Sequence, residues 1–338
     1  MATTTGSYEG QTMSITWDII SPYTATATDE LIQGYGGADT IYGNALDNYL
    51  FGDQRGDRSD FDATPDGADI LYGFGGDDVI DPGSGVGNYV NGGDDIDTLD
   101  YRYVTPGQTL IIDMELGTAD AGTYGTTSFV NMENVFGSLY GPNFLYGDAN
   151  DNVFYGGYYN DDIKGRDGSD SIYGYAGDDE LRGGAGNDHI QGGRGHDLVV
   201  SSRGADTVIG GQGHDTLEGG RGRDWIEGSS GRDTILGEQG NDTLNGGNGR
   251  DVLIAGSGTD RLMGGAKADR FVFDRNSDTN KIFDFDSSDL IKIKSGANGL
   301  SDLDFTDTSA GLRIEFGNVE IFLKGLDLSD IDAGNFVF

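Results

Sequence analysis

The sequence contains no cysteine among its 338 residues, which excludes disulfide bonds and cysteine nucleophiles. It has only three histidines, and it has neither the H-E-x-x-H pattern of zinc proteases nor the G-x-S-x-G turn of serine hydrolases. No apolar run approaches the length of a membrane-spanning helix, and residues 1–20 lack the basic start and apolar centre of a secretory signal peptide. Because we find no constellation of catalytic groups, we expect no enzymatic activity from this chain.

Positively charged residues are also scarce. The chain has 21 Lys and Arg against 58 Asp and Glu, so its formal net charge is −37 at pH 7. Such a chain repels the phosphates of nucleic acids and the anionic headgroups of membranes, so neither is an expected partner. A chain this charged would be disordered without a counter-ion. The composition therefore indicates that cations take part in folding.

The most regular feature of the sequence is a nine-residue repeat that runs without slippage from Gly147 to Val272, in fourteen copies. The sixth position is aspartate in every copy except the first, which has Asn152. The eighth position is always apolar, and its residues are Phe154, Ile163, Ile172, Leu181, Ile190, Val199, Val208, Leu217, Ile226, Ile235, Leu244, Leu253, Leu262 and Phe271. A fixed period of this kind is typical of a solenoid.

Each copy has about six turn-forming residues followed by a three-residue strand, whose middle side chain, at the eighth position, faces inward. Glycine suits the turns because they need left-handed or otherwise strained backbone. Two consecutive copies, with their strands facing each other, then form one flattened coil, and stacked coils bury the eighth-position side chains between two sheets. The pattern therefore predicts an all-β fold, a parallel β-solenoid.

Stacking places the aspartates of every second copy above one another, in two columns. The first column contains Asp161, Asp179, Asp197, Asp215, Asp233, Asp251 and Asp269. The second column contains Asp170, Asp188, Asp206, Asp224, Asp242 and Asp260. Carboxylates repeated every ~5 Å repel each other by about 1 kcal/mol per neighbour even in water.

A calcium ion between successive turns would remove this repulsion. Calcium accepts about six to eight oxygen ligands in flexible geometry. One carboxylate from each of two adjacent turns, with carbonyl oxygens of the glycine-rich backbone, could supply them. We therefore expect ion binding and folding to be one event.

Two segments, GGAGNDHIQ (183–191) and GGQGHDTLE (210–218), match every fixed position of the pattern GGxGxDxUx, in which U is a large apolar residue. The repeat run thus resembles the RTX, or hemolysin-type calcium-binding, nonapeptide family. The resemblance implies a calcium-loaded parallel β-roll, which a type I ABC exporter secretes to the outside or the surface of a Gram-negative bacterium. It also implies that the sixth-position aspartates are calcium ligands and that loop carbonyls complete the coordination. Asn152 departs from the pattern, so the first site of the run is expected to be weak or empty.

The repeats divide the chain into five expected segments. These are an N-terminal cap (1–30), a first, interrupted β-roll block (31–99), a strand spacer insert (100–146), the main β-roll (147–272), and a C-terminal β cap that ends in a type I secretion signal (273–338). The predicted calcium ligands of the first block are Asp39, Asp57, Asp69, Asp78 and Asp97. An insertion at 58–66 breaks the period there, and near Gly87 the sixth-position aspartate is missing. We expect the spacer to pack on the roll and to leave the solenoid continuous.

Two further groups of side chains leave alternatives open. His196 and His214 lie two copies apart at the fifth position, where we expect only the backbone to contribute; a transition-metal site is the alternative. The main roll is also rich in arginine, at Arg182, Arg194, Arg203, Arg221, Arg223, Arg232, Arg250 and Arg261. These arginines either relieve the repulsion among the carboxylates or form a strip that binds an acidic polysaccharide such as alginate, a cell surface or another copy of the chain.

The expected function is that of a secreted calcium-binding β-roll protein. It would fold on binding calcium outside the cell and have a structural, surface-layer, matrix or adhesive role. The alternative is a calcium-dependent RTX enzyme, such as a relative of polysaccharide epimerases, lipases or proteases, whose catalytic module is divergent or missing.

Overall fold

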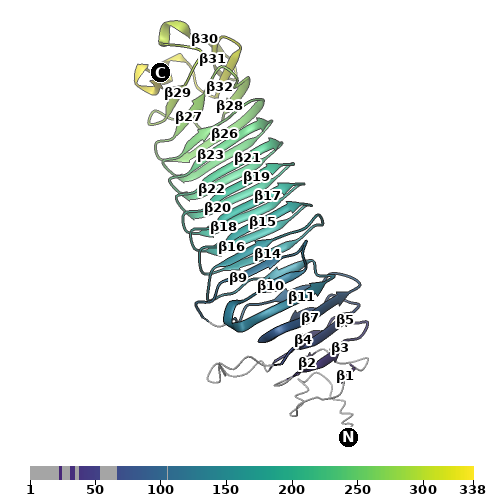
Figure 1. The fold of residues 1–338 in the computed structure, drawn as a ribbon. Helices are drawn as coiled ribbons and strands as arrows, with labels where there is room; N and C mark the ends of the chain where they lie inside the picture. Colours follow the sequence, from purple (N-terminus) through teal and green to yellow (C-terminus); the bar gives the residue numbers. More distant parts are fainter. Residues whose placement is uncertain (1–22, 25–30, 35–37, 54–66, 105) are drawn as a thin grey trace. The chain divides into compact units, whose positions relative to one another are not determined.

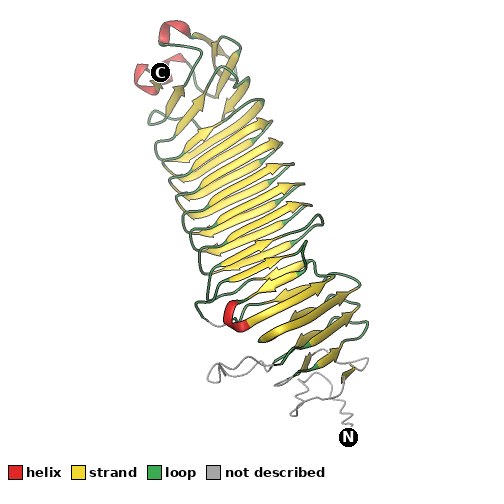
Figure 2. Ribbon diagram, in the orientation of Figure 1, coloured by secondary structure: helices red, strands yellow, loops and turns green. Residues whose placement is uncertain are grey.

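The computed structural model describes residues 23–24, 31–34, 38–53, 67–104 and 106–338 (Figure 1). The chain divides into two compact units, Met1–Tyr159 and Asn160–Phe338. In the described ranges the regular structure is almost entirely β-strand, with four short 3-10 helices and no α-helix (Figure 2). The 3-10 helices are η1 (Gly122–Tyr124), η2 (Leu300–Asp302), η3 (Leu328–Asp330) and η4 (Ala333–Asn335).

The unit Asn160–Phe338 is a parallel β-solenoid with two sheets. One sheet contains β15 (Asp162–Asp167), β17 (Glu180–Ala185), β19 (Leu198–Arg203), β21 (Thr216–Gly222), β23 (Thr234–Gly240), β25 (Val252–Ile254), β27 (Arg270–Phe273), β29 (Leu290–Ile293) and β33 (Phe336–Val337). The other contains β16 (Ser171–Ala176), β18 (His189–Arg194), β20 (Thr207–Gly213), β22 (Trp225–Gly231), β24 (Thr243–Gly249), β26 (Thr259–Ala266), β28 (Thr279–Ile282), β32 (Val319–Lys324), β31 (Gly311–Phe316) and β30 (Asp304–Thr308). From β15 to β27 neighbouring strands pair in parallel, as Ile163 with Leu181 and Val199 with Leu217, which is the predicted register of two nonapeptides. The predicted fold class is confirmed.

The apolar core of this unit consists of the eighth-position side chains. Residues such as Leu217, Ile226 and Ile235 are 0 % exposed, and the same is true of every eighth-position residue from Ile163 to Phe271. Since the strands are stacked in register, each of these side chains packs between equivalent residues of the turns on either side. This continuous column of buried side chains supplies the hydrophobic contribution that no single nonapeptide could supply alone.

The strands are longer than predicted. They extend through the first three or four positions of the following repeat, as in the seven-residue β20. The second position has positive φ, for example 118° at Gly211, and a Cβ there would collide with the carbonyl oxygen of Gly193 in the preceding turn. Glycine thus permits a close backbone approach inside the sheet, whereas the sequence pattern had suggested only a turn.

Glu238 occupies this second position with φ 67° and an exposed side chain. Left-handed backbone destabilises the folded state by about 1–2 kcal/mol when the residue has a Cβ, and glycine removes this cost. Glycine also gives the unfolded chain more conformational freedom, which lowers stability by about 0.5–1 kcal/mol. Glu238→Gly should therefore raise the free energy of unfolding by about 0.5–1 kcal/mol, measured by urea denaturation in excess calcium.

Glu218→Gly is the matched control, because it removes the same charge from an interior position of β21 where the backbone is ordinary. It should lower the free energy of unfolding by roughly 0.5–1 kcal/mol. Equal effects of the two substitutions would show that the left-handed backbone at position 238 stores no strain.

The unit Met1–Tyr159 is a less regular solenoid of the same kind. One sheet contains β1 (Tyr23–Thr24), β3 (Thr40–Tyr42), β5 (Ile70–Phe74), β7 (Gly85–Gly93), β11 (Gly125–Val130), β10 (Thr118–Asp120), β9 (Leu110–Asp113) and β13 (Asn143–Tyr146). The other contains β2 (Leu31–Gln33), β4 (Tyr49–Phe51), β6 (Val79–Asp81), β8 (Thr98–Asp100), β12 (Asn134–Phe136) and β14 (Val153–Gly157). Thr40 of β3 pairs with Ile70 of β5, and this longer step along the chain reflects the predicted interruption of the period.

The spacer differs from the prediction, because its strands lie within the sheet and do not pack on its surface. β10 pairs antiparallel with both β9 and β11, while β9 pairs in parallel with β13 and β11 with β7. The cause is that the spacer has its own inward residues, Leu110, Ile112, Ala119 and Phe129, which are at most 4 % exposed. These side chains continue the core. The insert therefore adds its strands to the sheet, and one of them, β10, is antiparallel to its neighbours.

The C-terminal residues cover the last strands of both sheets. β28 pairs in parallel with β32. Beyond β32 the sheet adds β31 and then β30, and each of these strands is antiparallel to the one before it. In the other sheet the two-residue strand β33 pairs with β29. The exposed backbone groups of a parallel sheet edge are thereby used within the chain.

Candidate metal centre

The aspartates at the sixth position lie in two columns, and backbone hydrogen bonds hold the carboxylates in place. The N–H of each aspartate donates to Oδ1 of the equivalent aspartate in the next turn of its column, as from Asp179 to Asp197 at 2.9 Å and from Asp224 to Asp242 at 2.9 Å. All such bonds from Asp161 to Asp251 and from Asp170 to Asp242 measure 2.8–3.0 Å. The register of the turns thus fixes one oxygen of every column carboxylate from Asp179 to Asp269.

The other carboxylate oxygen, Oδ2, is buried and accepts no hydrogen bond within the described part of the chain. This holds for Asp179, Asp197, Asp215, Asp224, Asp233, Asp242, Asp251, Asp260 and Asp269, which are at most 2 % exposed. A buried carboxylate oxygen without a partner is costly. The repetition of this arrangement along both columns indicates a ligand that supplies positive charge.

The surroundings of Oδ2 show which kind of group fits there. A Cβ built on Gly219, the first residue of its repeat, would lie 2.7 Å from Oδ2 of Asp224 and 3.1 Å from the carbonyl oxygen of Gly237 in the next turn. A carboxylate oxygen and a carbonyl oxygen therefore both lie beside Gly219, and neither can donate a hydrogen bond. A cation satisfies both, and glycine keeps its path to the carbonyl free of side chains.

Burial raises the pKa of these carboxyl groups, and the neighbouring carboxylates raise it further, whereas the backbone hydrogen bond lowers it. The pKa rises from 3.8 to about 7 for Asp179, Asp197, Asp233 and Asp242. For Asp224 it rises to about 6. These carboxyl groups therefore hold protons more tightly than usual, because burial disfavours the charged form.

The available donors are oxygen atoms. Among the described residues no group of three or more His, Asp or Glu side chains gathers into a metal site, so backbone carbonyls would have to supply most of the coordination. Carboxylate and carbonyl oxygens without sulfur or nitrogen suit a hard cation with flexible geometry, which is the preference of calcium. The residues therefore fit calcium.

The first unit contains similar columns, but the number of residues between successive column members varies. Asp39 donates its N–H to Oδ1 of the distant Asp69 at 2.8 Å, and Asp78 donates to Oδ1 of Asp97 at 2.9 Å. Burial, with a contribution from nearby carboxylates, raises the pKa of Asp78 and Asp97 to about 7. Asp57, the remaining predicted ligand, lies outside the described residues.

Several column residues were not predicted. Asn88 accepts the N–H of Asp69 at 3.0 Å, Glu133 accepts that of Asp97 at 2.8 Å, and Asp289 accepts that of Asp269 at 2.9 Å. Each stands two residues before a fully buried apolar side chain: Val90, Val135 and Ile291. The spacing of an acid or amide two residues before a core residue could have identified them where the nine-residue period fails.

The side chains of His196 and His214 make contacts between turns, although only a backbone contribution was predicted. The N–H of His214 donates to Nδ1 of His196 at 2.8 Å, the N–H of Arg232 donates to Nδ1 of His214 at 2.9 Å, and the rings stack at 5.0 Å. Asp178 accepts the N–H of His196 in the same way at 2.7 Å. The fifth-position side chains thus link successive turns, and backbone N–H groups occupy both Nδ1 atoms.

The arginines fall into different environments. Arg182 forms ion pairs with Glu180 and, at 3.8 Å, with Asp162, and Arg261 lies over the ring of Phe283 at 4.2 Å. Arg203 and Arg221 are exposed, stand opposite each other in β19 and β21, and form no ion pair within the described ranges. Charge relief therefore accounts for Arg182 but not for Arg203 and Arg221.

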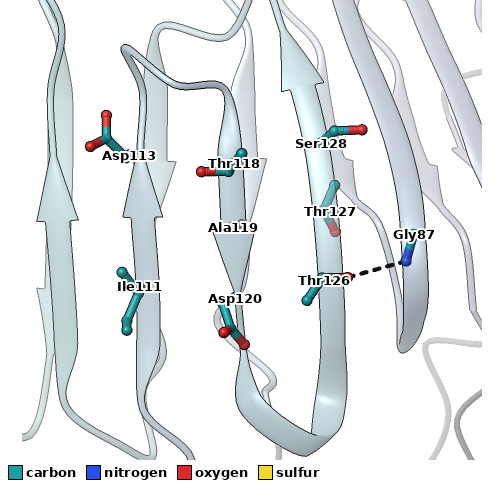
Figure 3. A pocket seen from close by; sticks show the side chains of 9 residues that line it. All are labelled: Gly87, Ile111, Asp113, Thr118, Ala119, Asp120, Thr126, Thr127 and Ser128. Carbon is teal, nitrogen blue, oxygen red and sulfur yellow. Dashed lines mark hydrogen bonds between the residues drawn. The ribbon is translucent and has the colours of Figure 1, made fainter.

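One shallow surface depression lies over the spacer strands β9, β10 and β11 (Figure 3). Its polar lining includes Asp113, Thr118, Asp120 and Thr126, and the N–H of Gly87 donates to Oγ1 of Thr126 at 3.2 Å. Both carboxylates accept turn N–H groups, Asp113 from Leu116 and Asp120 from Gly122. These contacts stabilise the turns of the spacer.

A parallel solenoid whose turns present columns of buried, unneutralised carboxylates is a calcium-binding β-roll. The model of the RTX calcium-binding nonapeptide repeat matches residues 24–54 and 66–88 and, in overlapping segments, residues 139–276, which together are more than half of the chain. The chain therefore belongs to the RTX calcium-binding nonapeptide repeat family.

Two solved structures are similar to parts of the chain. The extracellular lipase LipA from Serratia marcescens is 20 % identical over 59 % of this chain and 40 % of its own, with a TM-score of 0.28. The AlgE6R3 subunit of the Azotobacter vinelandii mannuronan C5-epimerase is 30 % identical over 35 % of this chain and 79 % of its own, with a TM-score of 0.29. This chain thus aligns with about two fifths of the lipase. No curated protein matches the sequence. In the described residues no helix has the length and apolar character needed to span a membrane.

Proposed function

We propose that this chain is a secreted calcium-binding β-roll protein that folds when it binds calcium outside the cell and that has a structural or surface-binding role. One observation carries the proposal: along both columns, a buried Oδ2 without a hydrogen-bond partner among the described residues lies beside the first-position glycine, and a carbonyl oxygen of the next turn lies beside the same glycine. The ligands we propose are the predicted aspartates of both units, Asp57 included. To these the structure adds Asp289 at the end of one column.

Each part of the repeat has a separate task in this mechanism. Oδ1 of the sixth residue takes the N–H of the preceding turn, which orients the carboxylate. Oδ2 is left to face the ion, and the first-position glycine gives access to the carbonyl oxygens. Bound calcium supplies the positive charge that offsets the repulsion within a column.

Calorimetric titration of the calcium-free chain tests this proposal. Calcium should bind at many sites, with release of protons near pH 7, because the pKa of several column carboxyl groups is about 7. Magnesium is the control, and it should bind far more weakly because it demands a small octahedral site and loses water reluctantly. A chain that takes up no calcium, or takes up both ions alike, is not what we propose.

Secretion is part of the proposal. Free calcium is scarce in the cytosol, so the chain would stay unfolded until a type I exporter delivered it to a calcium-rich exterior. The segment 328–338 combines acidic and apolar residues, as the recognition signals of such exporters do. We also propose that the chain has no catalytic activity, which turnover of alginate, casein or a lipid ester by the pure protein would refute.

A second candidate function rests on the exposed arginines. Arg203 and Arg221 face the same way on adjacent strands, and Arg223 follows in the turn. Like charges side by side are unfavourable unless an anion joins them, and guanidinium groups pair well with carboxylates. An acidic polysaccharide such as alginate would offer carboxylates in a row.

Charge reversal tests this surface. Arg221→Glu with Arg223→Glu should reduce retention on immobilised alginate at least tenfold at low ionic strength. Arg232→Glu with Arg250→Glu makes the same change of charge on turns that follow the other sheet, and it should retain most of the binding. Equal losses in both pairs would indicate a general effect of net charge.

A further inference from the structure

We propose that asparagine at a column position closes the gap between turns by itself, so that the turns of Asn88, Asn143 and Asn152 hold no calcium and remain folded without it. This inference rests on the proposed calcium-binding function and adds a division of the chain into calcium-dependent and calcium-independent turns. These asparagines are at most 1 % exposed.

Asn143 shows how the amide replaces an ion. Its Oδ1 accepts the N–H of Ser138 in its own turn at 2.7 Å, whereas Oδ1 of a column carboxylate accepts an N–H of the adjacent turn. Its Nδ2 donates to the carbonyl oxygens of Ser138 at 3.1 Å, of Gly141 at 3.3 Å and of Gly156 at 3.2 Å. A neutral amide group thus satisfies carbonyls of its own turn and of the next turn.

The equivalent carbonyl in an aspartate turn has no such donor. Gly156 begins the second repeat after the one that contains Asn143, as Gly237 begins the second repeat after the one that contains Asp224. The carbonyl of Gly237 lies near Oδ2 of Asp224, which cannot donate. The amide N–H therefore stands where a carboxylate turn needs a cation, and it carries no charge that must be neutralised.

Asn88 and Asn152 also have partners at both ends of the amide, but Asn88 is linked to an adjacent turn through its oxygen and Asn152 through its nitrogen. Nδ2 of Asn88 donates to the carbonyl oxygen of Pro82 at 3.0 Å, and its Oδ1 accepts the N–H of Asp69. Nδ2 of Asn152 donates to the carbonyl oxygen of Glu133 at 3.0 Å, and its Oδ1 accepts the N–H of Asp148 at 3.1 Å. In each case both the oxygen and the nitrogen of the amide have hydrogen-bond partners, so the group has no buried atom that requires a metal.

The two units differ in how often they use this device. All three of these asparagines belong to Met1–Tyr159, whereas every sixth position from Asp161 to Asp269 in the second unit is aspartate. Removal of calcium should therefore open the turns between Asp161 and Asp269 while the turns closed by Asn143 and Asn152 keep their hydrogen bonds.

Hydrogen–deuterium exchange of the intact chain in EGTA tests this division. Peptides covering 138–156 should exchange about tenfold or more slowly than peptides covering 165–269, whereas both should be protected in calcium. Equal and complete loss of protection in the two regions would overturn the inference.

Native mass spectrometry of substituted chains in saturating calcium gives an independent count of ions. Asn143→Asp should bind one more calcium than wild type, and Asp224→Asn one fewer, because each substitution exchanges an amide for a carboxylate, or the reverse, at a column position. Asn150→Asp is the matched control: it adds the same charge at an exposed residue outside the columns and should leave the count unchanged.

The outcomes separate the inference from the proposed function. If Asn143→Asp binds the wild-type number of ions, or if Asp224→Asn loses none, the amide inference is wrong although calcium binding stands. If wild type itself binds no calcium, the proposed function fails, and the inference falls with it.

Discussion

Removal of calcium at neutral pH should abolish the β-sheet signal of the repeat region and expand the chain. In the unit Asn160–Phe338 the Oδ2 atoms of the column residues from Asp197 to Asp269 are buried, and most of them lack a partner in the described part of the chain, so without the ion these turns carry uncompensated buried carboxylates. A loss of about 1–3 kcal/mol per turn, repeated along two columns, exceeds the stability of an ordinary domain. The measurement is far-ultraviolet circular dichroism with size-exclusion chromatography in EGTA.

The control for this experiment is EGTA already saturated with calcium, which keeps the chelator and the ionic strength constant while leaving the sites loaded. The compact, sheet-rich form should return on adding calcium back, because binding and folding are one equilibrium. A chain that stays compact and ordered in EGTA would show that hydrogen bonds and the apolar core suffice.

Acid should partly replace calcium. In the calcium-free folded state the pKa of Asp179, Asp197, Asp233, Asp242 and Asp269 is about 7, against an ordinary value of 3.8. Because the folded state binds these protons more tightly than the unfolded state, it is most stable below pH 3.8 and loses that stability as the pH rises toward 7. In EGTA the sheet signal should therefore increase as the pH falls from 8 to about 4.5.

The same protons compete with calcium, so the affinity for calcium should fall over the same range of pH. A variant with Asp233→Asn and Asp251→Asn has fewer carboxylates to protonate, and its calcium-free form should persist to higher pH. Circular dichroism at a series of pH values, with and without calcium, gives both results. If the calcium-free signal does not change between pH 8 and 4.5, desolvation of the carboxylates does not control folding.

The fold of the repeat region could be predicted because two positions of each nonapeptide carry separate local signals. The apolar eighth residue indicates which side chain is buried, and the aspartate two residues earlier indicates which residue lies in a column. The register of the strands then follows from counting repeats along the sequence. Pairs such as Ile163 with Leu181 show that counting in steps of two repeats was sufficient. The length of the strands could not be predicted, because the glycines that look like turn residues also permit close backbone approach within a sheet.

Outside the regular repeats, counting could not predict which residues follow one another in a column, although aspartates of the first block were predicted as ligands. The step along the chain lengthens between Asp39 and Asp69, between Asp97 and Glu133, and slightly between Asp269 and Asp289. Insertions are tolerated where a surface loop can lengthen without disturbing the ladder, so these steps depend on tertiary packing that the period does not contain. The incorporation of β10 into the sheet has the same origin, since it depends on the pairing of β11 with the distant strand β7.

The antiparallel strands at the end of the chain have a consequence for assembly. A stack of identical coils offers at its last coil the same surface that it offers at every earlier one, so a second molecule could continue it indefinitely. Here β31 is antiparallel to β32 and β30 is antiparallel to β31, so this sheet ends in a three-strand meander and not in another coil. A second molecule would therefore meet at this sheet edge a strand joined to its neighbour by a tight turn, and it would not find the step of two nonapeptides that relates the coils of the roll.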